Sequence, residues 1–194
     1  MVKSKKQTKP THFQKKGTQK KSGSWLKDMI LIFLMALALA LVVKTFLVDS
    51  RVVPSASMYP TIEVGDRVLV NKLSYVWDRE PQRGDIVIFK APEEMQSNSD
   101  LLKRVIGLPG ETIYIHDGTV YIDDIPLEED YLNERPNYEY GPVTVPEDCY
   151  FMLGDNRNNS VDAHRWQEAF TPEEDIKGKV FFRYWPLYRI GDID

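Results

Sequence analysis

Two serines lie between two prolines in residues 54–61, which read Pro54-Ser55-Ala56-Ser57-Met58-Tyr59-Pro60-Thr61. A proline fixes its own φ and restricts the residue before it, so this stretch is stiff and poorly suited to a helix. A hydroxyl held in a stiff loop can act as a nucleophile, although most loops of this composition are solvated turns. The stretch is therefore a candidate site only if a base lies elsewhere in the chain.

Several other kinds of site lack their sequence signatures. The chain has no HExxH, CxxC, GxSxG or Walker motif. Cys149 is the only cysteine, which excludes an intrachain disulfide and a thiolate metal cluster, and we interpret it as a packed small hydrophobe. We therefore expect no metal and no cofactor, and we look for a hydroxyl nucleophile with an unusual base.

Lys103 is the candidate base. A lysine amine can take a proton from a serine only when it is neutral, and at pH 7 about one free lysine in 2,500 is neutral. Burial lowers the pKa of a lysine, and a pKa of about 7 to 8 costs roughly 3 to 5 kcal/mol. Lys103 lies in an apolar stretch, where strand alternation places it on one face with Leu101 and Val105. A lysine that extends to the surface is the commoner case, and spacing alone does not decide between the two.

The N-terminal part of the chain predicts a membrane anchor behind a basic tail. Residues 1–24 carry eight lysines and no acid, and we expect them to be a disordered cytoplasmic tail. Residues 25–48 are predicted to be a transmembrane signal anchor, because 29–43 are all apolar and extension to 48 gives 20 residues, or about 30 Å of helix. A cleaved signal sequence is the alternative, but no small-x-small site follows the run. The lysines place the N-terminus in the cytoplasm and residues 49–194 outside.

Residues 49–194 are acidic and alternate between apolar and polar side chains. They hold 15 Lys and Arg against 28 Asp and Glu, which argues against nucleic-acid binding. Alternation predicts strands at 67–73, 85–90, 101–107, 149–153 and 180–185, and a hairpin of 112–115 and 119–122 turning at Gly118. The Gly-Asp pairs before the first two strands suggest that these two are neighbours. Thr171 is a predicted N-cap of a short helical turn. We interpret residues 128–142 as a long excursion, that is, an extended connection or short insertion between strands. The pattern is that of a mainly β domain with few short helices.

Five blocks in order carry a resemblance to a known family. They are the 54–61 stretch, Gly65-Asp66-Arg67-Val68-Leu69-Val70-Asn71-Lys72, Arg83-Gly84-Asp85, Lys103-Arg104-Val105-Ile106-Gly107-Leu108-Pro109-Gly110 and Gly154-Asp155-Asn156-Arg157-Asn158-Asn159-Ser160-Val161-Asp162. Together they resemble the bacterial type I signal peptidases, from the anchor to about residue 162. The resemblance implies a mainly β fold, in which one N-terminal transmembrane helix precedes an extracytoplasmic domain of coiled antiparallel sheets.

The resemblance also implies roles for five residues. Ser57 would be the nucleophile and Lys103 the general base of a Ser/Lys dyad. The Ser57 backbone N–H and the Ser55 hydroxyl would form the oxyanion hole. Ser160 would orient the lysine amine, and Asp162 would support the loop that carries Ser160.

The sequence departs from the family after Asp162, where Ala163-His164-Arg165 replaces the usual Ser-Arg. Either Arg165 or His164 could pair with Asp162. A second alternative makes His164 the base of a Ser-His-Asp triad with Ser57, but Lys103 already fits that role, and a structural histidine is the more ordinary interpretation.

The implied reaction is hydrolysis of one peptide bond in an exported precursor, after a small-x-small site and through an acyl-enzyme. The expected partners are signal-peptide-bearing precursors and the phospholipid bilayer, and we expect a monomer in the cell membrane. Trp77 or the 181–185 strand could touch the bilayer surface, although burial in the core is the ordinary role of both. Two other functions stay open from the sequence: a non-catalytic β domain that binds exported proteins, and a self-cleaving Ser/Lys regulator.

Overall fold

The computed structural model describes residues 24–76, 79–96 and 99–193. The chain divides into two compact units, Met1–Leu39 and Ala40–Asp194. The predicted basic tail, up to residue 23, and Trp77 lie outside the described residues. All of the described strands belong to the second unit.

The N-terminal helix is apolar on every side. Helix α1 (Ser24–Val42) continues into a π-helical turn (Val43–Leu47), and Trp25–Leu47 is long and apolar enough to cross a membrane. Leu31, Phe33 and Leu39 are each more than half exposed within the described part of the chain. The helical segment ends one residue before the predicted anchor does, because Val48 begins strand β1 and pairs with Asn71.

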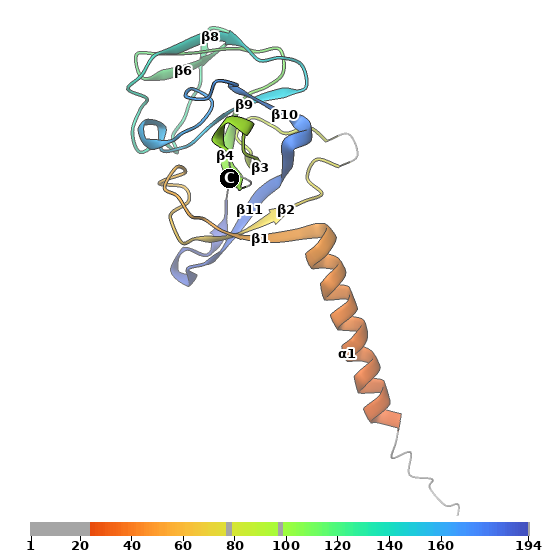
Figure 1. Cartoon of the computed structure of the whole chain (residues 1–194). Coiled ribbons are helices and arrows are strands. Elements are labelled where there is room, and N and C mark those ends of the chain that lie inside the picture. The colour runs from red at the N-terminus through yellow and green to blue at the C-terminus, as the bar shows by residue number, and fades with distance from the viewer. Residues whose placement is uncertain (1–23, 77–78, 97–98, 194) are drawn as a thin grey trace, which may run out of the picture. The chain divides into compact units, whose positions relative to one another are not determined.

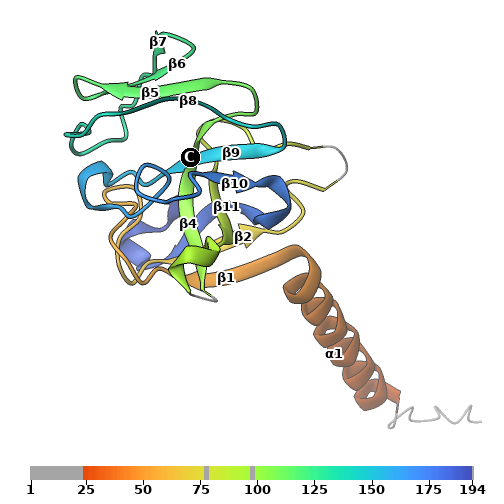
Figure 2. The same ribbon diagram turned by 45° about the horizontal axis from the view of Figure 1, so that its top comes forward.

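The strands form two antiparallel sheets (Figures 1 and 2), which confirms the predicted mainly β class. The larger sheet has the order β1-β2-β11-β3-β4-β9-β10, with β12 paired to β11, and the smaller has the order β7-β6-β5-β8. The strand bounds are β1 Val48–Val52, β2 Arg67–Asn71, β3 Ile86–Lys90, β4 Asp100–Gly107, β5 Thr112–His116, β6 Thr119–Ile122, β7 Ile125–Pro126, β8 Tyr140–Thr144, β9 Cys149–Leu153, β10 Phe170–Pro172, β11 Ile176–Trp185 and β12 Gly191–Asp192.

The predicted strands all occur, but one predicted neighbour relation is wrong. The β5–β6 hairpin is confirmed, and its turn uses positive φ at both Asp117 and Gly118, as a two-residue hairpin turn requires. Strands β2 and β3 are not adjacent, because β11 lies between them and pairs with both. Strand β11 also begins at Ile176, four residues earlier than predicted.

The helical turns differ from expectation in detail. Single 3₁₀ turns occur at Glu93–Met95, Arg157–Asn159, Glu173–Asp175 and Leu187–Arg189. The predicted turn near residue 173 is confirmed, but its N-cap is Pro172 without a side-chain cap, because Thr171 belongs to β10. The predicted excursion ends at residue 139, since strand β8 includes Gly141 and Pro142.

Two hydrophobic clusters hold the second unit together. One lies between the sheets and joins Val87, Phe89 and Val105 of the larger sheet to Ile113 and Val120 of the smaller. The other packs residues of β2, β3 and β11 against the loop that follows β1, through Val53, Met58 and Ile62 of that loop. The second cluster therefore anchors the stretch that carries the two candidate serines.

Candidate active site

The loop from Val53 to Asp66 presents its serines above a buried base. Met58 is 1% exposed and Ile62 is fully buried in the second cluster. The loop closes on itself, because the Val53 N–H donates to the Asp66 carbonyl and the Gly65 N–H donates to the Val53 carbonyl, each at 2.9 Å. The buried side chains and these two bonds hold the intervening serines at the surface.

Lys103 reaches this loop from β4. Its side chain is buried, with 3% of the residue exposed, and its Nζ donates to Ser57 Oγ at 2.7 Å. Ser55 Oγ lies 3.4 Å from Ser57 Oγ. Burial lowers the pKa of Lys103 from the ordinary 10.5 to about 8, against the opposing effect of the Asp162 and Asp155 carboxylates. The structure thus brings together Ser55, Ser57 and Lys103, and it makes the amine easier to deprotonate.

A groove of about 280 Å³ runs from Ser57 and Lys103 toward the start of β4. Its apolar lining includes Val53, Met58 and Leu102. Two strand edges border it. Among the described strands, β1 pairs only with β2, and the first half of β4, Asp100–Lys103, pairs with β3 but not with β9. An extended peptide in this groove has free backbone groups to pair with.

Asp162 is held by His164. Its Oδ2 accepts from the Gly154 N–H at 2.8 Å, and its Oδ1 pairs with His164 Nδ1 at 2.5 Å. Arg165 contacts the histidine rather than the acid, since its Nε donates to His164 Nε2 at 3.1 Å. Both ring nitrogens of His164 are therefore engaged with groups other than Ser57, and the Ser-His-Asp alternative is not formed.

Ser160 is close to the nucleophile loop but does not make its predicted contact. Its hydroxyl is fully buried and has no hydrogen-bond partner among the described residues, Lys103 included. Gly154 lies between the two loops, because a Cβ placed on it would stand 2.4 Å from both the Ser160 Oγ and the Ser57 carbonyl oxygen. The absence of a side chain at residue 154 allows this close approach.

Several residues that sequence reasoning did not select join the loops of the site. The Asn156 N–H donates to the Ser57 carbonyl at 3.0 Å. Asp155 accepts from Thr61 Oγ1 at 2.6 Å and forms a buried two-bond pair with Arg104. These partners lie 94 and 51 positions from Asp155 in the chain, so the sequence blocks that contain them gave no signal of which residues pair.

The 128–139 excursion covers the buried arginines of this network. Tyr131 stacks on the Arg104 guanidinium, whose carbon lies 3.9 Å from the ring centroid. Glu129 forms a two-bond ion pair with Arg157, and both side chains are almost fully buried. The Tyr138 ring stacks on His164 at 3.9 Å between centroids. The excursion therefore supports the loop that bears Asp155, Ser160 and Asp162.

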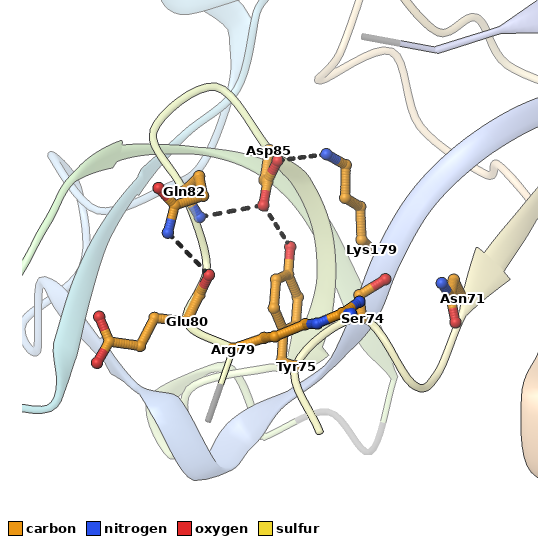
Figure 3. Close-up of a pocket in the computed structure, with 8 residues that line it drawn as sticks. All are labelled: Asn71, Ser74, Tyr75, Arg79, Glu80, Gln82, Asp85 and Lys179. Atoms are coloured by element: carbon orange, nitrogen blue, oxygen red, sulfur yellow. Dashed lines mark hydrogen bonds and ion pairs between the residues drawn. The ribbon is translucent and has the colours of Figure 1, made fainter. Parts of the chain in front are cut away.

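Two other polar clusters lie away from the dyad. A cavity of about 570 Å³ surrounds Asp85, which accepts hydrogen bonds from Tyr75, Gln82 and Lys179 (Figure 3). These bonds satisfy the buried carboxylate and fix the turn that leads into β3. None of the predicted site residues lines this cavity.

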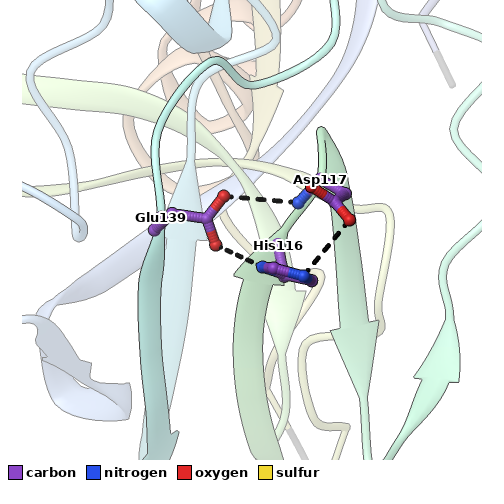
Figure 4. Close-up of side chains that lie close together, drawn as sticks. All are labelled: His116, Asp117 and Glu139. Atoms are coloured by element: carbon purple, nitrogen blue, oxygen red, sulfur yellow. Dashed lines mark hydrogen bonds and ion pairs between the residues drawn. The ribbon is translucent and has the colours of Figure 1, made fainter.

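The second cluster is exposed at the β5–β6 hairpin (Figure 4). His116 Nδ1 lies 2.6 Å from a Glu139 carboxylate oxygen, and its Nε2 lies 3.2 Å from an Asp117 oxygen. Both carboxylates, Glu139 most strongly, raise the pKa of His116. One nitrogen and one oxygen from each carboxylate lie within 4.8 Å of one another, but all three side chains are exposed, and we interpret the cluster as a surface ion pair.

Comparisons with known proteins agree on one family. Residues 26–185 match the family model described as signal peptidase, peptidase S26. A signal peptidase I of Leptolyngbya laminosa is 42% identical over 93% of this chain and 90% of its own length. The signal peptidase I P of Bacillus subtilis subsp. natto is 35% identical over 89% and 96%. The chloroplastic thylakoidal processing peptidase 1 of Arabidopsis thaliana is 39% identical over 81% of this chain and 48% of its own length.

Proposed function

This chain belongs to the signal peptidase family, peptidase S26, and from that premise we propose that Ser57 and Lys103 are its catalytic dyad. Membership makes the chain a serine endopeptidase that cleaves signal peptides from precursor proteins. The observation that carries the dyad is the 2.7 Å contact between Lys103 Nζ and Ser57 Oγ, made by an amine that is almost completely buried.

The proposed reaction proceeds through an acyl-enzyme. Neutral Lys103 takes the Ser57 proton as Oγ attacks the scissile carbonyl, and the resulting ammonium returns a proton to the leaving amine. The Ser57 N–H and the Ser55 hydroxyl donate to the oxyanion of the tetrahedral intermediate. Water then attacks the ester and loses a proton to Lys103. The Lys103 ammonium gives this proton to Ser57 Oγ as the ester bond breaks, and the signal peptide leaves with a new carboxylate.

Ser160 and Asp162 serve as positioning residues in this proposal. When Lys103 carries the proton, its ammonium needs an acceptor other than the acylated serine. The Ser160 hydroxyl is buried, has no partner among the described residues and faces the same side of Gly154 as the Ser57 carbonyl, so it is suited to that task. Asp162 fixes Gly154 through its N–H and so sets the approach of the two loops.

The groove beside the dyad selects small side chains in this proposal. Its volume is about 280 Å³, and Val53, Met58 and Leu102 give it an apolar lining, which suits alanine-sized residues before the scissile bond. The precursor adds as an extended strand between β1 and the free edge of Asp100–Lys103. Cleavage after a small-x-small site follows from that fit.

We place the catalytic domain, residues 49–194, outside the cell membrane, behind a single anchor at 25–48 and a cytoplasmic tail at 1–24. The apolar helix and the lysine-rich N-terminus support this orientation. Protease added outside intact cells should then degrade the domain and spare the N-terminus. One relative is a thylakoidal peptidase, so membrane fractionation is needed as well. Recovery of the protein in thylakoids alone would mean that it is anchored in the thylakoid membrane and not in the cell membrane.

The bilayer is a second partner in the proposal. Trp185, Leu187, Tyr188 and Ile190 are between 47% and 85% exposed, although burial was the ordinary expectation for the end of β11. Arg189 ties this segment to the nucleophile loop through the Pro60 carbonyl at 3.2 Å. An aromatic and apolar surface of this kind suits the interfacial layer of a membrane, and Arg189 joins it to the loop that carries Ser57. The enzyme acts there as a monomer.

A precursor-processing assay tests the dyad. Purified full-length protein in detergent should cleave a precursor with an Ala-x-Ala site and leave one with bulky residues at both small positions intact. Ser57→Ala and Lys103→Ala should each lose at least about 10³-fold in kcat/KM. Lys90→Ala, which changes an exposed lysine on neighbouring β3, is the matched control. Unchanged cleavage by either dyad variant would refute the assignment.

A further inference from the structure

An ion pair closes the end of the groove opposite the dyad. Arg51 on β1 and Asp100 on β4 both line the groove, and Arg51 Nη2 lies 3.1 Å from an Asp100 oxygen. Strands β1 and β4 are not paired with each other, since β2, β11 and β3 separate them in the sheet. The ion pair therefore crosses from one wall of the groove to the other.

Neighbouring charges hold both members of the pair. Arg51 Nε also lies 2.8 Å from an Asp49 oxygen, and the other Asp100 oxygen lies 2.5 Å from Lys177 Nζ. An isolated exposed pair stabilises little, but charges in a chain restrain one another. The Asp100 side chain is 12% exposed, whereas the Arg51 side chain is 43% exposed and open to an entering peptide.

The position of the pair fixes which substrate residue meets it. Asp100 precedes Lys103 by three residues along β4, which is about 10 Å at the rise of a strand. A peptide strand alongside β4 with its scissile carbonyl at Ser57 advances by the same rise per residue. Its fourth residue before the scissile bond then lies beside Arg51 and Asp100.

We infer that the Arg51–Asp100 ion pair is a specificity-determining end wall that selects against bulky side chains at the fourth residue before the scissile bond. The inference rests on the proposed function of the groove. The ion pair limits the space at that substrate residue, so a large substrate side chain must displace Arg51 from Asp100. A small side chain passes with the ion pair intact.

The test uses two precursors that differ only at that residue, one with Ala and one with Trp. Wild-type protein should cleave the Ala precursor about tenfold or more better in kcat/KM, a typical discrimination for a difference in side-chain size. Arg51→Ala should bring the ratio close to one, because it removes the wall. Asp100→Asn keeps the shape of the side chain but breaks the ion pair, and it should lower the ratio severalfold.

Lys90→Ala is the control, because Lys90 is an exposed lysine on neighbouring β3 that does not line the groove. It should keep the wild-type ratio. Wild-type ratios in both Arg51→Ala and Asp100→Asn would overturn the inference, and so would an equal loss on both precursors. The Ala precursor with Ser57→Ala tests the dyad separately, because retained cleavage there would refute the dyad whatever the ratio at the fourth residue.

Discussion

Lys103 combines deep burial with a neutral partner. Its direct hydrogen bond goes to the Ser57 hydroxyl, while the Asp155 and Asp162 carboxylates act on it from a distance. Loss of hydration outweighs both carboxylates, and the pKa falls to about 8. The unfolded chain binds the proton more tightly than the folded protein does, with a pKa of about 10.4. The free energy of unfolding should therefore rise with pH between about 8 and about 10.4. Below about pH 8 Lys103 is charged in both the folded and the unfolded chain, so the whole free-energy cost of burying its ammonium is present.

Replacing Lys103 with methionine should stabilise the protein at pH 7. The difference between the two pKa values corresponds to about 3 kcal/mol, and methionine fills a similar volume without a charge to desolvate. We expect urea unfolding of full-length Lys103→Met at pH 7 to give a free energy higher by up to about 3 kcal/mol. The exposed Lys90→Met should change little. A destabilised Lys103→Met would contradict the proposed cost of burial.

His164 takes the place of a charge partner for the buried Asp162. Its Nδ1 pairs with the acid at 2.5 Å while its Nε2 accepts from Arg165 Nε. Asparagine can supply a donor near the Nδ1 position. Alanine leaves the buried Asp162 carboxylate without that donor, which should cost about 1 to 3 kcal/mol of folding stability. His164→Ala should lose stability and processing activity, and His164→Asn should recover most of both. Equal losses in the two variants, in unfolding and in precursor cleavage, would count against the pairing.

At the scale of elements, the site depends on the close approach of two loops. Gly154 allows this approach, since a Cβ there would collide with a backbone carbonyl as well as with the Ser160 side chain. Gly154→Ala should displace the Ser57 loop from Lys103 and reduce kcat/KM at least about 10²-fold. Gly191→Ala is the control, because nothing lies within 4 Å of its Cβ position and its φ is not positive. Equal activity of the two variants in the processing assay would show that the spacing is unimportant.

Local elements were predictable from the sequence, and distant pairings were not. The β5–β6 hairpin follows from two short alternating runs and a Gly118 turn. The insertion of β11 between β2 and β3 depends on a strand about 90 residues further along the chain, and similar Gly-Asp entries cannot reveal it. The identity of the partner of Asp162 was likewise open, because both His164 and Arg165 lie within reach. The residues alone marked the 54–61 stretch and Lys103 as candidates, and the family resemblance chose Ser57 as the nucleophile. The contacts of Asn156 and Thr61 required coordinates.

At the scale of the whole molecule, the proposal gives the apolar helix and the exposed apolar surface the same partner, the bilayer. Leu187→Asp adds a charge to that surface, and a charge in the interfacial layer is costly. We expect it to slow precursor cleavage in phospholipid vesicles while leaving cleavage in detergent unchanged. Ile125→Asp, at a residue that is 68% exposed on the smaller sheet, should have no effect in either. If Leu187→Asp and Ile125→Asp slowed cleavage in vesicles equally, the proposal that this surface contacts the bilayer would be wrong.

The pH dependence of kcat/KM for an Ala-x-Ala precursor tests most directly whether neutral Lys103 activates Ser57. Activity should rise with pH as the ammonium loses its proton, with a midpoint at about 8. The profile should keep that midpoint in His164→Asn, because the histidine only positions the loop. A midpoint at about 10.4 would show a lysine that is not desolvated, and one at about 6.5 that disappears in His164→Asn would make histidine the base. Either result would contradict the Ser57–Lys103 dyad.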